Sequence, residues 1–323
     1  MDLQRLHYFL AVMEHQNLST AAQLLRVSQP TLSRQMRALE REFGTPLFVR
    51  AGRGIEPTEA AKRLSEGFKG LERQLRSLKS EVASASDQPS GEVAFGIPPS
   101  PRTLLAVPLI GRFAEAFPNV TVRVTEETSG QVSDQIAGGM LDLAVTNIHE
   151  PVRGVTAEPL GREQMLLIGP PDSKLTRRAS IAIEDLGDVP LILTTRPNSL
   201  RLFVETRLAR IGRKTKICIE ANTLPLMTDL VMARLGHTVL PSCGVRELLK
   251  KKLVSACPVE GFYITWLIAQ PKSRPLSFAA LQLARVLREI ADEQIAKKIW
   301  EPAEMTTKDA EGSAGQNFLT GAE

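Results

Sequence analysis

Apolar residues recur at helical spacing through the N-terminal part of the chain. The first stripe repeats every three or four positions, as one face of a helix requires: Leu3, Leu6, Leu10 and Met13. Asn17 and Ser19 are favourable N-cap residues for a second helix, which the pattern predicts over 20–26. Ser28 can cap a third helix over 29–43, and Gly44 is suited to end it. The pattern therefore predicts three short helices in succession.

The third predicted helix has an apolar face and a basic face. At a helical turn of about 100° per residue, the following side chains lie within about 40° of one direction: Leu32, Met36, Leu39 and Phe43. The opposite face carries Pro30, Ser33, Arg34, Arg37 and Arg41. No acidic residue occurs between Glu14 and Glu40. A surface rich in arginine and free of acid suits contacts to phosphates.

Two short extended segments, 46–50 and 55–58, follow the third helix. Arg53 lies between them and is flanked by Gly52 and Gly54. Glycine between extended segments is typical of a tight turn, so these segments predict a β-hairpin wing.

A long helix is predicted after Thr58, which can serve as its N-cap. Its apolar residues form a heptad seam at strict three-four spacing: Ala61, Leu64, Phe68, Leu71, Leu75, Leu78 and Val82. A period of 3.5 rather than 3.6 residues favours a helix that associates with a second copy of itself. The alternative is a stripe that the body of the same chain covers.

Residues 84–91 are mostly small and polar and are suited to a hinge. After them, predicted strands and helices alternate along the chain. Predicted strands cover 93–97, 120–125, 141–146, 165–169, 191–194, 216–220 and 263–269. Predicted helices cover 104–117, 131–137, 199–211, 224–234 and 277–299. This alternation favours a mostly parallel sheet with helices on both faces, divided into two sub-domains. Residues 303–323 have little apolar content and predict a disordered tail.

Composition narrows the function classes. The 323 residues include no apolar run long enough to cross a membrane, and the N-terminus lacks the basic start of a signal peptide. Cys218, Cys243 and Cys257 are scattered, which favours buried thiols in a reducing cytoplasm over disulfides or a metal site. We find no phosphate loop, dinucleotide fingerprint or metalloprotease motif, and therefore expect no cofactor and no enzyme.

The net charge of +4 is concentrated at one end of the chain. Residues 1–86 hold 13 Lys and Arg against 9 Asp and Glu, and the remainder is balanced at 27 of each. The basic excess therefore coincides with the predicted N-terminal helices and hairpin, as expected for a partner that carries phosphates.

The N-terminal motifs resemble those of the LysR-type transcriptional regulators. The resemblance rests on these runs: Phe9–Val12, Leu18–Leu25, Val27–Met36, Leu39-Glu40, Gly44–Arg50 and Pro57–Ala60. Further along, Phe113–Pro118 and Gly139–Ala144 resemble the first regulatory helix and the G-x-L-D-L-A strand of that family. Residues 90–93 and 96–100 resemble the branch that contains the nitrogen assimilation control protein.

The resemblance implies a fold and a division into domains. The fold is an N-terminal all-α winged helix-turn-helix with a long linker helix, followed by an α/β domain similar to periplasmic binding proteins, in two lobes. We expect DNA binding by 1–58, a dimerisation helix and hinge over 59–90, a regulatory domain over 91–302 and the tail over 303–323. Lobe I would comprise about 91–161 and 267–300 and lobe II about 162–266, with crossovers near 160–163 and 264–268.

The resemblance also implies functional residues. The expected DNA contacts are Ser28, Gln29, Pro30, Thr31, Ser33, Arg34, Arg37, Arg50 and Arg53. Because open α/β sheets bind ligands beyond the carboxyl ends of their strands, the expected effector contacts are Ser100, Arg102, Thr103, Thr128, Ser129, Thr146, Asn147, Thr195, Arg196, Asn198 and Ser199. Helix N-termini that converge with two arginines predict an anionic effector.

The expected partners are double-stranded promoter DNA, a small effector, further copies of the chain in a dimer or tetramer, and RNA polymerase. Two alternatives stay open: a regulator of the same fold that needs no effector, and a solute-binding protein. The basic face of the third predicted helix and the lack of a signal peptide argue against a solute-binding protein.

Overall fold

The computed structural model describes residues 2–52, 54–83, 89–147 and 152–302. Its N-terminal part contains helices α1 (Leu3–His15), α2 (Leu18–Leu24) and α3 (Gln29–Phe43) and the antiparallel hairpin β1 (Phe48–Ala51) and β2 (Gly54–Pro57). The three predicted helices and the wing are thus confirmed. The predicted tail, 303–323, lies outside the described residues.

Local hydrogen bonds explain where these helices begin and end. The Asn17 side chain accepts hydrogen bonds from the backbone N–H groups of Ser19 and Thr20, at 2.9 and 3.1 Å, and so starts α2. Ser28 accepts from the N–H of Thr31 at 3.2 Å and starts α3. Gly44 ends α3 with a φ of 67°, a conformation that glycine adopts without steric cost.

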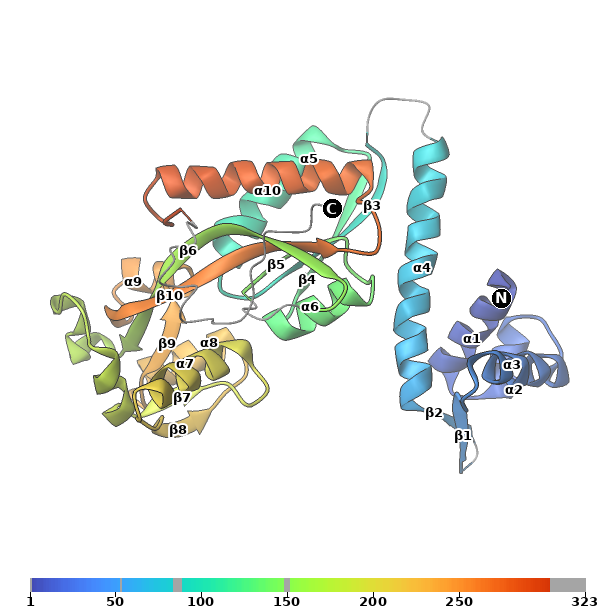
Figure 1. Cartoon of the computed structure of the whole chain (residues 1–323), viewed down its shortest axis with the longest axis horizontal. Coiled ribbons are helices and arrows are strands. Elements are labelled where there is room, and N and C mark those ends of the chain that lie inside the picture. The colour runs from blue at the N-terminus through green and yellow to red at the C-terminus, as the bar shows by residue number, and fades with distance from the viewer. Residues whose placement is uncertain (1, 53, 84–88, 148–151, 303–323) are drawn as a thin grey trace, which may run out of the picture.

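Helix α4 (Glu59–Ala83) stands between the N-terminal helices and the rest of the molecule (Figure 1). Its first turns belong to the N-terminal core, where Ala61 and Phe68 are buried beside Phe9, Val12 and Leu39. The interpretation of the seam as a stripe covered by the same chain therefore holds for its near end. The near end is covered within the chain, while Leu71 and Leu75 stay partly exposed.

A six-stranded sheet forms the centre of the C-terminal part, in the order β4-β3-β5-β10-β6-β9. Its strands are β3 (Gly91–Ile97), β4 (Val120–Glu126), β5 (Leu143–Thr146), β6 (Val155–Gly169), β9 (Thr238–Pro241) and β10 (Ser255–Pro271). Strand β3 pairs in parallel with β4 and β5, but the pairings of β10 with β5 and β6 and of β6 with β9 are antiparallel.

The expectation of a mostly parallel sheet is therefore wrong. The cause is the length of β6 and β10, which run through the whole sheet in opposite directions and pair from Val155 to Gly169. The sequence pattern predicted only the last third of β6 and most of the second half of β10.

Helices cover both faces of the large sheet. Helix α10 (Phe278–Ala296) and α5 (Val107–Ala116), which follows a π-helical turn η1 (Arg102–Ala106), lie on one face, and α6 (Ser129–Ala137) lies on the other (Figure 1). A smaller parallel pair, β7 (Leu191–Leu193) and β8 (Ile217–Glu220), lies with α7 (Ser199–Arg210) and α8 (Leu224–Met232).

The remaining elements are α9 (Ser242–Lys250) and three 3-10 turns, η2 (Pro171–Ser173), η3 (Leu175–Arg177) and η4 (Ile183–Asp188). The sequence pattern did not predict β9 or α9. Among the described residues, none of the helices has the length and hydropathy needed to span a bilayer.

Candidate functional site

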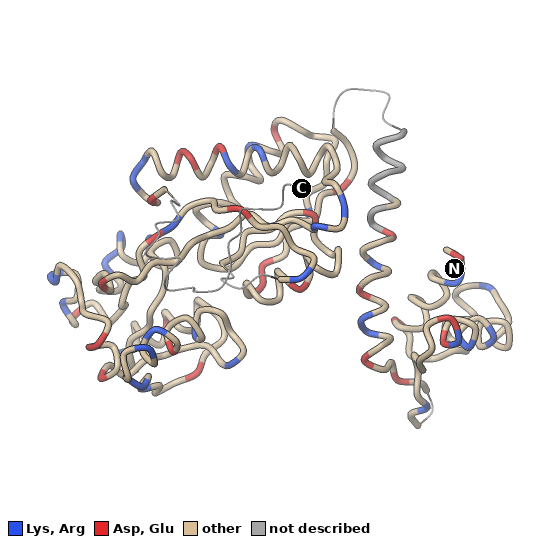
Figure 2. The backbone as a smooth tube through the Cα atoms, viewed as in Figure 1, with Lys and Arg blue, Asp and Glu red and all other residues tan. Residues whose placement is uncertain are grey.

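Helix α3 exposes the polar face that its sequence predicts. Ser28, Gln29, Pro30, Arg34 and Arg37 are exposed and Thr31 and Ser33 are partly exposed, while the apolar face is buried against α1 and α2. Phe43, which the pattern placed on that apolar face, is the exception at 42% exposed. Lys and Arg recur along this part of the chain in Figure 2. The face therefore offers guanidinium, amide and hydroxyl groups to a partner.

The carboxylates of α3 point to neighbouring segments and not to this face. The Glu40 carboxylate accepts hydrogen bonds from the backbone N–H groups of Leu47 and Phe48, at 2.9 and 3.3 Å. Glu42 pairs with Arg5 of α1 at 3.0 Å. Among the described residues, no ion pair joins Arg34 or Arg37 to an acid. The acids fix the hairpin and α1, and the two guanidinium groups stay available.

The β1–β2 hairpin lies close to α3 in the fold. Near its turn, the N–H of Ile55 donates to the carbonyl of Gln16 at 3.1 Å. At its base, the Thr58 hydroxyl donates to the carbonyl of Pro46 at 2.9 Å. Arg50 is exposed on β1. Arg53, the predicted tip residue, lies outside the described residues.

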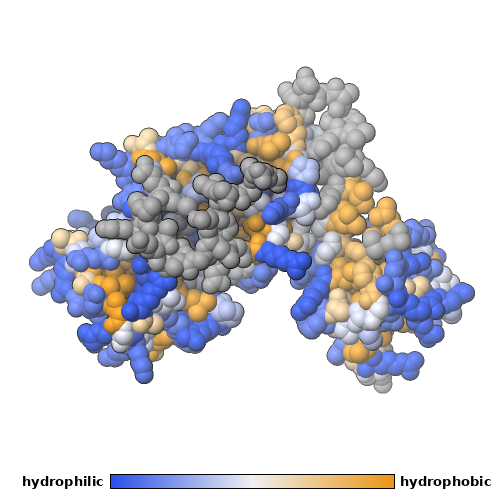
Figure 3. Space-filling view, in the orientation of Figure 1, coloured by the Kyte–Doolittle hydropathy of each residue, from blue (hydrophilic) through white to orange (hydrophobic). Residues whose placement is uncertain are grey.

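An apolar groove runs between α1 and α4. Among the described residues, its lining includes one acidic residue, Glu72, and one histidine; the described lining is Leu3, Leu6, His7, Leu10, Phe68, Leu71, Glu72 and Leu75. Leu3 is 57% exposed. Figure 3 shows hydrophobic residues gathered over the described part of α4 on the side of α1. The groove is an exposed continuation of the N-terminal core.

A second concave site lies where the large sheet meets the β7–β8 unit. With the part that opens to solvent, it has a volume of ≈ 550 Å³. Six residues predicted to contact an effector line it: Ser100, Thr128, Ser129, Asn147, Asn198 and Ser199. The Ser199 hydroxyl donates to the side-chain oxygen of Asn147 at 3.2 Å. These two residues bring α7 and the end of β5 together across the site.

The other five predicted residues do not line this pocket. Arg102 pairs with Glu126 at 3.1 Å and Arg196 with Glu205 at 2.7 Å, and both arginines are largely exposed. Thr103 is exposed on η1. Thr146 is buried and contacts Ser133, while the Thr195 hydroxyl donates to Asn222 at 2.8 Å. The two arginines that suggested an anionic effector are therefore occupied elsewhere.

Thr194 and Asn222 were not among the residues predicted from the sequence. Both line the pocket, and Thr194 is 7% exposed with a buried hydroxyl that has no hydrogen-bond partner among the described residues. Buried hydroxyls are nearly always paired, so an orphan in a pocket wall indicates a place for a ligand or water. The predicted strand 191–194 placed Thr194 inside the sheet, whereas β7 ends one residue earlier, at Leu193.

Helix N-termini supply the electrostatics of the pocket. None of its described lining residues carries a charge. Thr128 caps α6, Asn198 caps α7 and Thr223 caps α8, and Thr128, Asn198 and Leu224 line the site. The first N–H groups of a helix lack intrahelical acceptors, and the helix dipole adds partial positive charge there. Three such ends favour an anionic group within an otherwise apolar and hydroxyl-bearing pocket.

Comparisons with known proteins cover both parts of the chain. Residues 3–62 match the bacterial regulatory helix-turn-helix protein, lysR family, and residues 86–292 match the LysR substrate binding domain. The HTH-type transcriptional regulator BbuR of Bordetella bronchiseptica is 31% identical over 267 residues, 82% of each chain. The nitrogen assimilation regulatory protein nac of Klebsiella aerogenes is 29% identical over 249 residues, 77% of this chain and 81% of that protein.

Solved structures share the fold at lower identity. A full-length variant of OxyR from Pseudomonas aeruginosa superposes with a TM-score of 0.66 at 23% identity and covers 90% of this chain and 94% of its own. Full-length CbnR in complex with its target DNA gives a TM-score of 0.64 at 22% identity, over 90% of this chain and all of that chain.

Proposed function

Because the chain belongs to the LysR family of bacterial transcriptional regulators, we propose that it binds promoter DNA through α3 and the β1–β2 hairpin, under the control of a small effector. The observation that carries the proposal is the exposed face of α3, on which Arg34 and Arg37 project with no acidic partner among the described residues. The solved CbnR complex supports it, since that relative of the same fold was captured on its target DNA.

The residues of α3 and the wing divide by type into those that would contact bases and those that would contact the DNA backbone. Arg34, Arg37, Gln29 and Ser33 would contact base edges in the major groove, where arginine pairs with guanine and glutamine with adenine. Ser28, Pro30 and Thr31 at the start of the helix and Arg50 on the wing would contact the backbone and set the register. Arg53, which the sequence predicts at the tip of the wing, would enter a neighbouring minor groove, which is narrow and strongly negative in A/T-rich DNA.

A footprint on the DNA that flanks the gene tests this function. We expect a protected pseudo-palindrome, because one α3 covers only a half-site and a two-fold dimer doubles the contacts. Addition of candidate metabolites should change the extent of protection or the bending of the site. A chain that protects no DNA next to its gene or elsewhere in its genome would contradict the proposal.

The effector we propose is a small carboxylate or similar anion with an apolar body. The N-termini of α6, α7 and α8 would hold the anionic group, and Trp266, Met227 and Leu240 in the pocket wall would pack on the apolar part. Ser100, Asn147 and Thr194 would add hydrogen bonds. The lack of a charged lining residue among those described favours the second candidate, a regulator that acts without an effector.

Self-association is the remaining part of the proposal. The groove between α1 and α4 would seat a second copy of α4, and the regulatory domains would join two dimers into a tetramer. The division into 1–58, 59–90 and 91–302, with lobes of about 91–161 plus 267–300 and 162–266, follows the same plan. We propose that such a regulator acts in the cytoplasm, contacts RNA polymerase and has no catalytic activity of its own, as its relatives are named as regulators.

A further inference from the structure

A buried carboxylate lies behind the wall of the proposed effector pocket. Glu163, in the middle of β6, is 2% exposed. Its Oε1 accepts a hydrogen bond from the indole Nε1–H of Trp266 at 2.6 Å. Its Oε2 accepts from the Ser242 hydroxyl at 2.6 Å and from the backbone N–H of Cys243 at 2.9 Å. Three donors from two other elements thus converge on one side chain.

Each donor belongs to a part that shapes the pocket. Trp266 and Pro241 line it. Pro241 is the N-cap residue of α9, and its side chain accepts no hydrogen bond from the N–H groups at the start of that helix. Glu163 supplies that cap from a distant strand, at the helix end where negative charge is stabilised. Burial and the nearby Glu163 carboxylate also raise the pKa of the Cys243 thiol well above its ordinary value.

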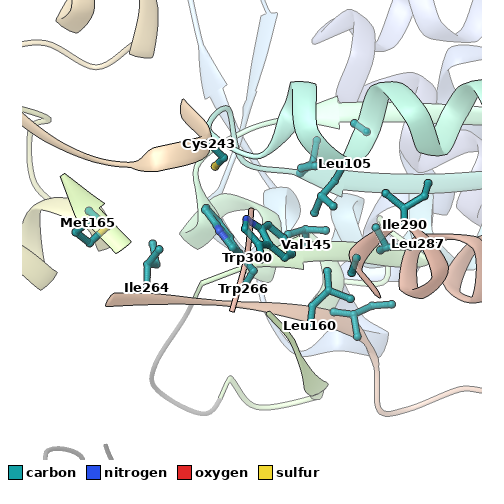
Figure 4. Close-up of a cluster of buried hydrophobic side chains, with 14 of the residues drawn as sticks. Leu105, Val145, Leu160, Met165, Cys243, Ile264, Trp266, Leu287, Ile290 and Trp300 are labelled. Atoms are coloured by element: carbon teal, nitrogen blue, oxygen red, sulfur yellow. The ribbon is translucent and has the colours of Figure 1, made fainter. Parts of the chain in front are cut away.

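The pairing of β6 with β10 is irregular close to Glu163. Trp266 pairs with Gly161 and Leu267 with Pro159, so Leu160 is the extra residue of a β-bulge. Bulges bend a strand locally and commonly mark positions where its direction changes. The ring of Trp300 covers Gly161 so closely that a Cβ there would lie 2.5 Å from the ring. Figure 4 shows Trp266 and Trp300 beside each other with Cys243 nearby.

Helix α9 also contacts the opposite side of the pocket. A Cβ on Gly244 would lie 3.2 Å from the hydroxyl oxygen of Ser100, a pocket residue that follows β3. The helix that Glu163 caps therefore touches the β3 side of the pocket directly. Through Trp266, Glu163 is bonded to β10 of the bulged strand pair. Through Ser242 and Cys243, it is bonded to α9, the helix that touches Ser100.

We propose that Glu163 is a positioning residue that fixes α9, the helix of lobe II that touches Ser100 of lobe I, and keeps Trp266 in the wall of the effector site, and that it thereby limits movement of one lobe against the other. The inference rests on the proposed effector pocket for its regulatory meaning. Its physical content is independent of any ligand: loss of the Glu163 hydrogen bonds frees α9 and the bulged strands to move against each other. An effector that displaces Trp266 would act on the same bonds.

A distance measurement between the lobes tests the inference without a known effector. Cys218, the exposed native thiol on β8, and a cysteine introduced as Glu115→Cys on exposed α5 carry spin labels, while Cys243 and Cys257 are buried. Labelled chains are diluted with unlabelled Cys218→Ser chains, so that only distances within one chain are recorded. We expect one narrow distribution for the parent protein.

Glu163→Gln replaces one carboxylate oxygen by an amide NH2 group, which must face either the indole N–H of Trp266 or the donors of α9, because all three are hydrogen-bond donors. Trp266→Phe removes the indole donor and leaves a smaller ring in its place. Both variants should broaden or shift the distribution, and the double variant should do no more than either single change. Glu184→Gln, at an exposed acid of η4, is the control and should match the parent. If Glu163→Gln does not fold, the distance distribution of Trp266→Phe still tests the inference.

Parent-like distributions in both Glu163→Gln and Trp266→Phe would overturn the inference. A structural cap alone would lower the melting temperature and leave the distance unchanged. The effector proposal is tested separately. It fails if no metabolite in a screen raises the melting temperature of the parent protein, and that outcome does not change the measured distances.

Discussion

The ring of Phe68 in the linker helix packs edge-on against the ring of Phe9 in α1, with ring centroids 5.6 Å apart. Phe68 is 6% exposed and Phe9 is fully buried, so the contact belongs to the core of the N-terminal part. Phe68, which the heptad pattern assigned to the contact with a partner helix, is thus buried by residues of its own chain. The residues left for a partner lie farther along α4.

Replacement of Leu71 and Leu75 by glutamate should separate the proposed dimer. Both side chains line the groove between α1 and α4, and burial of each leucine is worth about 1.5–3 kcal/mol. Sedimentation should show loss of the parent assembly, and affinity for a palindromic operator should fall with it. Lys69→Glu, on the exposed side of α4, controls for added charge. Unchanged mass and affinity in the Leu71→Glu, Leu75→Glu variant would move the dimer contact elsewhere.

Removal of Ser33 and Arg34 side chains should abolish sequence-specific DNA binding. Ser33→Ala with Arg34→Ala deletes two groups on the exposed face of α3, and a good bidentate arginine contact discriminates by about 1–3 kcal/mol. The apolar face of α3 is untouched, so the melting temperature should stay near that of the parent. Gel shifts with operator and scrambled DNA measure the loss. Arg285→Ala, exposed on α10, is the control, and parent-like affinity in the double variant would end this assignment.

Thr194→Val should have opposite effects on stability and ligand binding. The Thr194 hydroxyl is buried without a partner among the described residues, so its removal should leave the free energy of unfolding unchanged or raise it by about 1 kcal/mol. If an effector accepts or donates a hydrogen bond there, its affinity should fall about tenfold, the equivalent of about 1.4 kcal/mol. Thermal shifts with a panel of small carboxylates report both effects.

The exposed Thr121→Val on β4 is the matched change for Thr194→Val. An effector that stabilises the parent and Thr194→Val chains equally would show that this hydroxyl does not contact it.

The three thiols should differ sharply in reactivity. Burial raises the pKa of Cys243 and Cys257, and Glu163 adds to the shift at Cys243, so both thiols are protonated and shielded at neutral pH. Since the thiolate is the nucleophile, only the exposed Cys218 should react quickly with a chromogenic disulfide reagent at about pH 7. We expect one fast thiol per native chain and three after denaturation. Cys218→Ser should abolish the fast phase, and a remaining fast thiol would contradict the burial of the other two.

The sequence predicted the N-terminal part almost completely, because its signals are local. Ser28 and Gly44 act within a few residues of themselves, and the structure places both at the ends of α3. The pocket was predicted less well. The strand-end rule located Ser100, Thr128 and Asn198, but it could not tell that Arg102 and Arg196 turn toward Glu126 and Glu205, since those pairings depend on tertiary packing.

Elements that depend on distant partners escaped prediction. Strand β9 has only four residues, and α9 begins after Pro241 without a local side-chain cap. Its cap is Glu163, which lies far away in the sequence, so no local pattern marks the start of the helix. The full length of β6 and β10 was missed for a similar reason, because each is stabilised mainly by the other.

The place of β10 within the sheet also has a consequence for synthesis of the protein. This strand lies between β5 and β6, yet residues 170–254 separate it from the end of β6 along the chain. On the ribosome, β3 to β6 emerge long before the strand that joins them, and their inner edges stay unpaired in the interval. Unpaired strand edges are prone to aggregation. The nascent chain therefore exposes these edges until β10 emerges, and slow translation over 170–254 should lower the yield of folded protein.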